Sequence, residues 1–290
     1  MDATHRLRTP ALLDELTTKL AGASALDKVA DPLQKLVTSL PPGRAKDALS
    51  GTPTGHPVHP ALVALPIGAF AGVAVLDASG GHPGASRRLL GFGILSVAPT
   101  AAAGLSDWGD TSGRERRVGV VHALCNVAAT LLMTASWWRR GRGDGGRGLS
   151  TVGLGLLGFS GWLGGHLAYA RGVGVDVTAF EDDITEWTDA MADGELVADT
   201  PAVARVGRND VLLVRRGGQI HAMADRCSHR GGPLHEGELV DGCVQCPWHG
   251  SRFVLEDGAI ARGPASRPQP CYESRVVDGR IQVRQPGGAT

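Results

Sequence analysis

Cysteine is scarce in this sequence, and so are aromatic residues and net charge. Five cysteines occur in 290 residues, Phe, Trp and Tyr make up 4%, and 29 basic residues balance 29 acidic ones. So few cysteines over this length do not form a disulfide scaffold. A net charge of zero creates no overall field that would attract nucleic acid. We therefore expect neither a disulfide-stapled domain nor a nucleic-acid partner.

Long apolar runs are abundant by contrast, and all of them lie in the first 175 residues. Four reach the roughly 20 residues that a helix needs to cross a bilayer; they span 60–78, 89–106, 118–138 and 149–175. They are rich in Gly, Ala and Ser, which let helices approach closely in lipid. A soluble bundle of buried helices is the alternative, but four runs separated by short Arg-containing loops favour a membrane. We expect an α-helical transmembrane bundle of four spans over residues 56–175, with the lipid bilayer as its partner.

The orientation of these spans follows from two weak signals. Four spans place both termini on one side, and Lys and Arg are equally numerous near the spans on both sides, so the positive-inside rule does not decide. The first ten residues, MDATHRLRTP, contain no apolar run and no adjacent arginine pair, hence no secretory or twin-arginine signal. We expect an integral protein of the cell membrane with both termini in the cytoplasm.

Residues 1–55 precede the first span and have an amphipathic helical pattern. Apolar residues follow a helical spacing between Leu26 and Leu40. Such a segment either lies on the membrane surface or packs against the rest of the protein.

Four histidines lie in or beside the apolar runs. His56 and His59 stand at the entrance to the first, His122 about one turn into the third, and His166 near the end of the fourth. Because successive spans alternate in direction, all four fall near one face of the bundle. Ionisable groups in a membrane are costly and are candidates for function, and facing imidazoles can hold a b-type haem. One interpretation is a haem or quinone site; the other is that these histidines only form hydrogen bonds at helix ends.

Four stretches of this half carry a family resemblance. GHPVHP, GLSDW, VGVVHALCN and GGHLAYARGVGV resemble a membrane family known as domain of unknown function 2231. The resemblance covers about residues 56–175 and implies the four-span topology, but it implies no activity.

The composition changes after residue 175. Residues 176–186 are acidic and polar, as a linker would be, and residues 187–290 contain short runs of alternating apolar and polar residues. Turn sequences such as GRND, RGG and EDG separate these runs. This pattern predicts an antiparallel all-β domain.

Two short Cys and His pairs lie within this β-rich part. Cys227 and His229 form a Cys-x-His pair, and Cys246 and His249 form a Cys-x-x-His pair. A mixed set of two thiolates and two imidazoles suits either a zinc ion or a [2Fe-2S] cluster. Zinc fingers place Cys with Cys and His with His, whereas each loop here offers one of each. That arrangement favours a binuclear centre with both thiolates on one iron and both imidazoles on the other.

The sequences around these pairs resemble the Rieske domain. CSHRGGPL and CPWHGSRF are similar to its two cluster-binding boxes, and EDGAIARGPA is similar to the segment that follows. The resemblance covers residues 187–285 and implies a [2Fe-2S] cluster at the tip of an all-β fold. It implies that Cys227 and Cys246 hold the buried iron, and that His229 and His249 hold the iron nearer to solvent.

The boxes resemble those of Rieske ferredoxins and oxygenases. The Rieske proteins of cytochrome bc complexes carry an extra cysteine in each box, and here Gly or Pro and Trp248 occupy those places. The tyrosine that those proteins place near Phe253 is absent as well, although Ser251 is kept. Fewer hydrogen bonds to the cluster imply a reduction potential below the upper end of the Rieske range, about −150 to +300 mV.

Four functions are compatible with this organisation. We favour a membrane-anchored carrier of single electrons whose donor and acceptor are unidentified redox proteins or a quinone. The main alternative is a subunit of a haem- or quinone-linked membrane oxidoreductase that uses the membrane-half histidines; a structural or sensing cluster is another. An oxygenase component would need two His and a carboxylate on a mononuclear iron, and we expect no such domain because the sequence ends at Thr290. No Gly-x-Gly-x-x-Gly motif indicates flavin or nicotinamide, and no complete catalytic site is visible.

Overall fold

The structure is a computed structural model that describes residues 11–39, 42–80 and 82–287. Its internal contacts divide the chain into two compact units. A helical unit comprises residues 1–40 and 59–173, and a β-rich unit comprises residues 41–58 and 174–290. The expected boundaries after residues 55, 175 and 186 stay a prediction.

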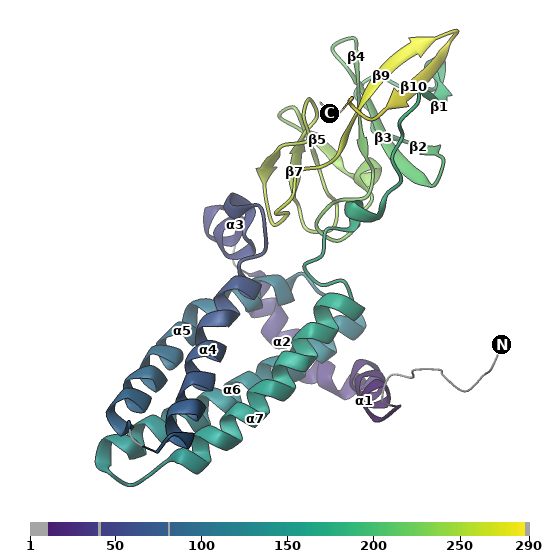
Figure 1. Ribbon diagram of the computed structural model, residues 1–290. Coiled ribbons are helices and arrows are strands. Elements are labelled where there is room, and N and C mark those ends of the chain that lie inside the picture. Colours follow the sequence, from purple (N-terminus) through teal and green to yellow (C-terminus); the bar gives the residue numbers. More distant parts are fainter. Residues whose placement is uncertain (1–10, 40–41, 81, 288–290) are drawn as a thin grey trace, which may run out of the picture. The chain divides into compact units, whose positions relative to one another are not determined.

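Six α-helices form the described part of the helical unit (Figure 1). Their bounds are α1 Ala11–Gly22, α2 Asp27–Thr38, α4 His59–Ala78, α5 Pro83–Gly109, α6 Gly113–Arg142 and α7 Arg147–Gly165. A short 3-10 helix, η1 (Ser24–Leu26), joins α1 to α2, and a π-helical turn, η3 (His166–Ala170), continues α7. Helices α4 and α5 pack as one antiparallel hairpin and α6 and α7 as another.

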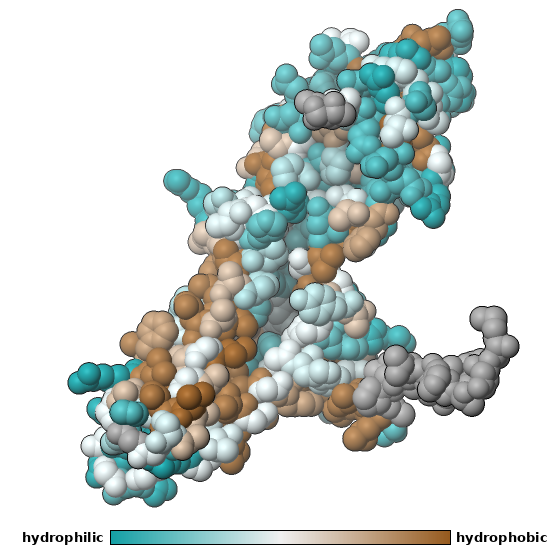
Figure 2. All heavy atoms as spheres, in the orientation of Figure 1, coloured by the Kyte–Doolittle hydropathy of each residue, from teal (hydrophilic) through white to brown (hydrophobic). Residues whose placement is uncertain are grey.

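Polar side chains are buried inside this unit beside apolar ones such as Phe70 and Leu90, whereas several other large apolar side chains face outward. Thr100 and Ser160 are buried, while Leu95 is 78% exposed and Leu131 is 65% exposed. Figure 2 shows hydrophobic side chains spread over the outside of these helices. A water-soluble bundle would bury its large apolar side chains instead. In lipid the observed arrangement is favourable, because small residues let helices approach and apolar ones meet the acyl chains.

Three helices, α4, α5 and α6, are long and apolar enough to cross a membrane. They correspond to the first three expected spans, and α4 and α5 continue through Pro66 and Pro99. The fourth expected span forms α7, but seven of its 19 residues are glycine, which lowers its hydropathy. The membrane region is thus supported, and the count of four spans is not confirmed.

The N-terminal helices pack against the other helices of their unit. Asp27 forms ion pairs with Arg116 at 3.0 Å and Arg117 at 2.7 Å. The Gln34 side-chain amide donates hydrogen bonds to the carbonyl oxygens of Gly109 and Thr111. Of the two alternatives for the amphipathic segment, the structure therefore shows packing.

Ten strands form two antiparallel sheets in the β-rich unit, as expected for an all-β domain. The larger sheet has the order β1-β10-β9-β4-β3-β2, and the smaller has the order β5-β6-β7-β8. The strands are β1 Thr188–Ala192, β2 Ala202–Val206, β3 Asn209–Arg216, β4 Gln219–Ala224, β5 Glu238–Val240, β6 Cys243–Gln245, β7 Arg252–Val254, β8 Ile260–Arg262, β9 Cys271–Val277 and β10 Arg280–Arg284. One short 3-10 helix, η4 (Val177–Phe180), precedes β1, and two others, η5 (Asp193–Glu195) and η6 (Leu234–Glu236), lie between strands.

Strand β3 lies between the two hydrophobic cores of this unit. Val211 and Leu213 pack into one core, and Leu212 and Val214, which point the other way, pack into the second. The run Val-Leu-Leu-Val is therefore apolar without alternation, because both faces of the strand are buried. The second core also contains the two box cysteines, so the candidate site rests directly on it.

A helical segment that precedes α4 also belongs to the β-rich unit. It contains α3 (Arg44–Ser50) and the short helix η2 (Thr52–Thr54). The sequence pattern did not reveal this association.

Candidate metal centre

Two loops with the same backbone bonding carry the candidate ligands. The first joins β4 to β5 and the second joins β6 to β7. In the first, Cys227 N donates to Gly232 O at 2.9 Å, and Cys227 O accepts from Gly231 N at 2.7 Å. In the second, Cys246 N donates to Ser251 O at 2.8 Å, and Cys246 O accepts from Gly250 N at 3.1 Å. Each cysteine thus opens a closed turn, which holds its side chain in a defined direction.

Both turns require a glycine at the same position. Gly231 and Gly250 each have φ of 74°, a left-handed conformation that costs a residue with a Cβ atom energy. Gly232 is needed for a different reason, since a Cβ there would lie 2.8 Å from Cys246 Sγ. The glycines of the boxes are therefore explained by backbone conformation and close approach.

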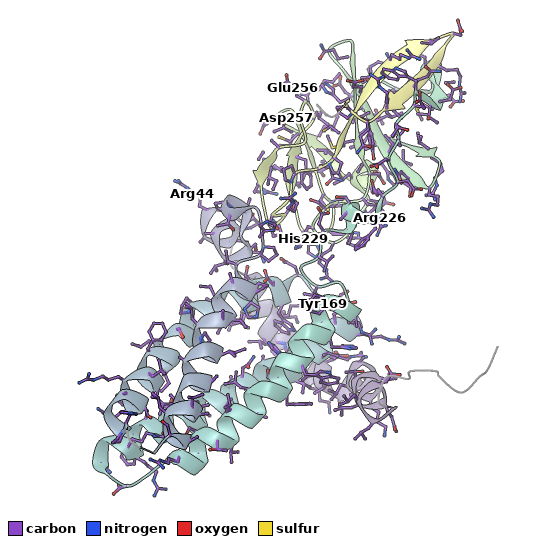
Figure 3. All side chains as sticks on the ribbon, in the orientation of Figure 1. Arg44, Tyr169, Arg226, His229, Glu256 and Asp257 are labelled. Carbon is purple, nitrogen blue, oxygen red and sulfur yellow. The ribbon has the colours of Figure 1, made fainter. Side chains whose placement is uncertain are left out.

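The turns bring like side chains together. The thiols of Cys227 and Cys246 are buried and hydrogen-bond to each other. The imidazole rings of His229 and His249 lie edge to face with centroids 5.0 Å apart; His229 is labelled in Figure 3. The structure thus places the four expected ligands as one pair of sulfurs and one pair of imidazoles.

The surroundings of the sulfurs favour the thiolate form of one cysteine. The pKa of Cys246 falls from 9.0 to about 7, because the Cys227 thiol and the backbone N–H groups of Trp248 and His249 hydrogen-bond to its sulfur. Hydrogen bonds to the charged form stabilise it. A thiolate is the form that binds metal.

A distant glutamine holds the first loop in place. The buried Gln269 side chain donates to the carbonyl oxygens of Ala224 and Arg226, and its Oε1 accepts from Ser228 N at 3.0 Å. Ser228 Oγ also donates to Arg267 O. Sequence reasoning missed Gln269, because nothing local to the boxes points to a residue so far along the chain.

The remaining cysteines of this unit lie outside the pair. Cys243 lies in β6 and Cys271 in β9, and burial raises the pKa of both thiols. Within the described ranges, no three His, Cys, Asp or Glu side chains are grouped to hold a single metal ion. Two thiols beside two imidazoles instead fit a binuclear group that takes two protein ligands on each metal.

Two histidines of the helical unit, His59 and His122, form hydrogen bonds that link one helix to the next. His122 Nδ1 pairs with Ser160 O at 2.8 Å, and its Nε2 pairs with the Asn126 side chain at 3.0 Å. His59 Nδ1 pairs with Thr100 O at 2.9 Å. Both nitrogens of His122 are thus used by the protein, which leaves no lone pair directed at a haem iron.

His59 and His122 occupy equivalent positions in two similar hairpins. The His59 ring lies against Gly104 and the His122 ring against Gly164, and a Cβ at either glycine would come within 3.2 Å of the ring. Gly104 lies four positions after Thr100, which bonds His59, and Gly164 lies four positions after Ser160, which bonds His122. The repetition indicates that each histidine links the two helices of its hairpin. A comparison of the two hairpin sequences could have revealed this repeated arrangement.

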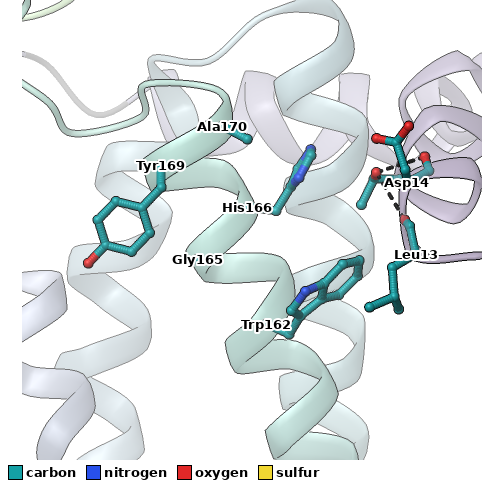
Figure 4. A pocket seen from close by; sticks show the side chains of 8 residues that line it. Leu13, Asp14, Trp162, Gly165, His166, Tyr169 and Ala170 are labelled. Carbon is teal, nitrogen blue, oxygen red and sulfur yellow. Dashed lines mark hydrogen bonds between the residues drawn. The ribbon is translucent and has the colours of Figure 1, made fainter. Parts of the chain in front are cut away.

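The other two membrane-half candidates have different surroundings. His166 lies in the π-helical turn, where its Nε2 accepts from Arg171 Nε at 3.2 Å. With Trp162 it lines a pocket of about 410 Å³ that Leu13 and Asp14 of α1 border (Figure 4). His56 belongs to the β-rich unit. A shared haem or quinone site is therefore not favoured.

Comparison with known proteins agrees with this geometry. A family model described as the Rieske [2Fe-2S] domain matches residues 186–273, and one described as a predicted membrane protein, domain of unknown function 2231, matches residues 55–177. The anthranilate 1,2-dioxygenase ferredoxin subunit of Burkholderia cepacia is 36% identical over 103 residues, which are 36% of this chain and 95% of that protein. Ferredoxin CarAc of Metapseudomonas resinovorans is 35% identical over 81 residues, 28% of this chain and 76% of that protein. The cytochrome b6-f complex iron-sulfur subunit of Chlorobaculum tepidum is 32% identical over 84 residues, 29% of this chain and 45% of that protein.

The β-rich unit therefore defines an iron–sulfur electron-transfer protein. The chain belongs to the Rieske [2Fe-2S] family, and it joins this domain to a predicted membrane domain. Its cofactor is a [2Fe-2S] cluster, and its function is the transfer of single electrons.

Proposed function

We propose that Cys227 and Cys246 hold one iron of the cluster and that His229 and His249 hold the other. The observation that carries this assignment is the grouping of the two thiols at one point and of the two imidazoles 5.0 Å apart at another. When bound, the cluster accepts and releases one electron at a time. The protein holds it by two rigid turns that rest on the second hydrophobic core.

The assignment is tested by removing one ligand and one neighbouring cysteine separately. Cys227→Ser should abolish the electron paramagnetic resonance (EPR) signal of the reduced cluster and lower iron and acid-labile sulfide to background. Cys243→Ser should leave both unchanged, because Cys243 lies in strand β6. An unchanged cluster in Cys227→Ser would refute the assignment.

We propose that the helical unit anchors this carrier in the cell membrane. Four spans are the arrangement we favour, with α7 as the fourth, since α7 packs along α6 and the carbonyl oxygen of Ser160 in α7 accepts the hydrogen bond from His122 in α6. An even number of spans returns the chain to the side on which it started. In this proposal the Rieske domain lies in the cytoplasm.

A topology experiment separates this arrangement from its alternatives. A membrane-impermeant thiol reagent applied to intact cells should fail to label cysteines introduced at exposed positions of the Rieske domain, such as Arg208 and Glu256. Labelling in intact cells would place the domain outside. Single cysteines at Gly80 and Gly143 should be labelled from the opposite side.

Redox proteins are the partners we propose for the cluster. The relatives named above include the ferredoxin subunit of a dioxygenase and a subunit of a cytochrome complex, and a membrane quinone is the second candidate. The haem-linked alternative is not favoured, because His122 uses both ring nitrogens within the helical unit.

A further inference from the structure

Residues 42–58, which we call the juxtamembrane knob, form a compact element just before α4. Helix α3 ends at Gly51, which has φ of 83°, and Gly55 has φ of 74°. Between them, Thr54 Oγ1 bonds to Gly51 O and His56 O, both at 2.9 Å. The knob therefore has its own turn structure, although it contains few residues.

Two side chains of the knob bind the loop that follows strand β8. Asp47 Oδ1 accepts a hydrogen bond from Gly263 N at 3.1 Å, and Thr52 Oγ1 donates one to Ala265 O at 2.8 Å. Gly263 and Ala265 are buried. A Cβ at Gly263 would lie 2.3 Å from Thr52 Oγ1 and 2.8 Å from Asp47 Oδ1, so this contact requires glycine at 263.

The same loop supports the second cluster box from the other side. Ala265 N donates to Ser251 Oγ at 3.0 Å, and Ser251 O accepts from Cys246 N at 2.8 Å. Arg262, just before Gly263, donates to Gly250 O through Nη2 at 2.6 Å and Nε at 3.0 Å. Ser251 is fully buried. A short chain of hydrogen bonds thus leads from Thr52 to the backbone of Cys246.

We propose that Asp47 and Thr52 are positioning residues for the iron–sulfur cluster. They clamp Gly263 and Ala265, and through Ser251 they set the geometry of the second box. The proposal rests on the proposed function in one respect, namely that Cys246 holds the cluster. Because the chain passes directly from the knob into α4, the support of the cluster box is covalently continuous with the first membrane helix.

A matched pair of threonines tests the clamp in the full-length protein in detergent. Thr52→Val removes the hydroxyl that bonds Ala265, whereas Thr54→Val removes one that bonds only within the knob. Thr52→Val should change the oxidised-to-reduced ratio of the cluster at a fixed solution potential by about threefold, which corresponds to about 0.7 kcal/mol. It should also alter the EPR line shape. Thr54→Val should match the unmodified protein, and Thr52→Ser, which keeps the hydroxyl, should restore it.

One further measurement keeps the test independent of redox activity, and a second examines the contact at Gly263 through the EPR signal. Asp47→Ala should speed hydrogen exchange of the Gly263 amide, which has lost its acceptor. Gly263→Ala should perturb the EPR signal, because the new methyl group meets the Thr52 hydroxyl. In the double variant with Thr52→Ala this hydroxyl is gone, and the effect of Gly263→Ala should be smaller. Effects of substitutions at residues in contact do not add.

The outcomes separate this proposal from the proposed function. The clamp is refuted if Thr52→Val and Thr54→Val give the same intact Rieske EPR signal and if Asp47→Ala leaves the hydrogen exchange of Gly263 unchanged. The proposed carrier function would still stand in that case. If the unmodified protein gives no Rieske signal, the proposed function fails, and the exchange of Gly263 still decides whether the clamp exists.

Discussion

In the helical unit both ring nitrogens of His122 are hydrogen-bonded, one to Ser160 of α7 and one to Asn126 of α6, whereas in the β-rich unit the rings of His229 and His249 pack edge to face. The residue type is the same, and the surroundings differ. His122 lies among backbone and amide partners of its own hairpin, which use its hydrogen-bonding capacity. His229 and His249 lie in tight turns that also hold Cys227 and Cys246, the proposed cysteine ligands. A histidine in a membrane span therefore indicates a cofactor only when its nitrogens are not used by the helices around it.

The two units also differ in what they bury. The β-rich unit buries large apolar side chains such as Phe253 and Leu212, as a water-soluble domain does. The helical unit buries Ser136 and Ser160 and exposes Leu95 and Leu131. Each unit thus matches a different solvent, which is the physical basis for a membrane anchor joined to a water-exposed carrier.

Replacing one histidine in each unit should give the largest difference between two variants in their cluster EPR signal. His249→Ala should abolish the Rieske EPR signal, because it removes a proposed ligand of the cluster. His122→Ala should keep the signal and lower only the thermal stability of the helical unit, since it breaks bonds to Ser160 and Asn126. Loss of the cluster signal in His122→Ala would contradict the separation of roles.

The ion pair between Asp77 and Arg140 should give the next largest effect. The two side chains are only 13% and 7% exposed and lie 2.5 Å apart. Arg140→Ala leaves the carboxylate without its cation, and breaking a buried pair in this way costs roughly 3–5 kcal/mol. Thermal unfolding in detergent, followed by circular dichroism, should show the helical transition at a lower temperature.

Arg139→Ala is the matched control, because Arg139 is exposed and its guanidinium donates to the carbonyl oxygen of Asp144, in the loop that follows α6. Its unfolding should resemble that of the unmodified protein. Equal destabilisation by both substitutions would show that the ion pair has no special role.

A smaller effect is expected in the turns of the β-rich unit. Gly250→Ala forces a residue with a Cβ into φ of 74°, which costs about 1–3 kcal/mol. The Rieske signal should persist but be lost at a lower temperature. Gly194→Ala should cost little, since Gly194 is exposed, has no positive φ and has open space around its Cα. An equal loss for both glycines would argue against the turn geometry.

The smallest effect is expected when the thiol of Cys246 is titrated in the cluster-free protein. The pKa of Cys246 is lowered from 9.0 to about 7, so its thiolate should form near pH 7. A lowered pKa stabilises the folded state above the ordinary value of the thiol, and this stabilisation is lost as the pH falls through about 7. The ultraviolet absorbance of the thiolate, taken as the difference from Cys246→Ser, checks this.

Cys271 provides the comparison for that titration. Burial raises its pKa to about 11, so the difference from Cys271→Ser should show no thiolate at neutral pH. A Cys246 thiolate that appears only near pH 9 would mean that neither the Cys227 thiol nor the N–H groups of the second loop lower the pKa of Cys246.

The features that lie close together in the sequence were predictable. The two box motifs place each Cys within three residues of a His, so the two short loops that carry these residues could be expected from local spacing, while their role as metal ligands stays a prediction. The helices α4 to α6 were visible as apolar runs, because lipid requires apolar surfaces over the whole length of a span.

The features that depend on distant contacts were not predictable. Gln269 acts on Ala224 and Ser228, and Asp47 acts on Gly263 across most of the chain. Their side chains are ordinary polar residues, whose role is decided only by the fold. The fourth span was expected from its apolar residues, yet the glycines of α7 weaken that signal.

The most direct test of the account is the reduced-minus-oxidised optical spectrum of the full-length protein in detergent, recorded together with its EPR spectrum. The account predicts the broad absorption and EPR signal of a Rieske cluster without haem bands. Sharp haem bands that disappear in His122→Ala would contradict it, because the helical unit would then hold a redox cofactor of its own.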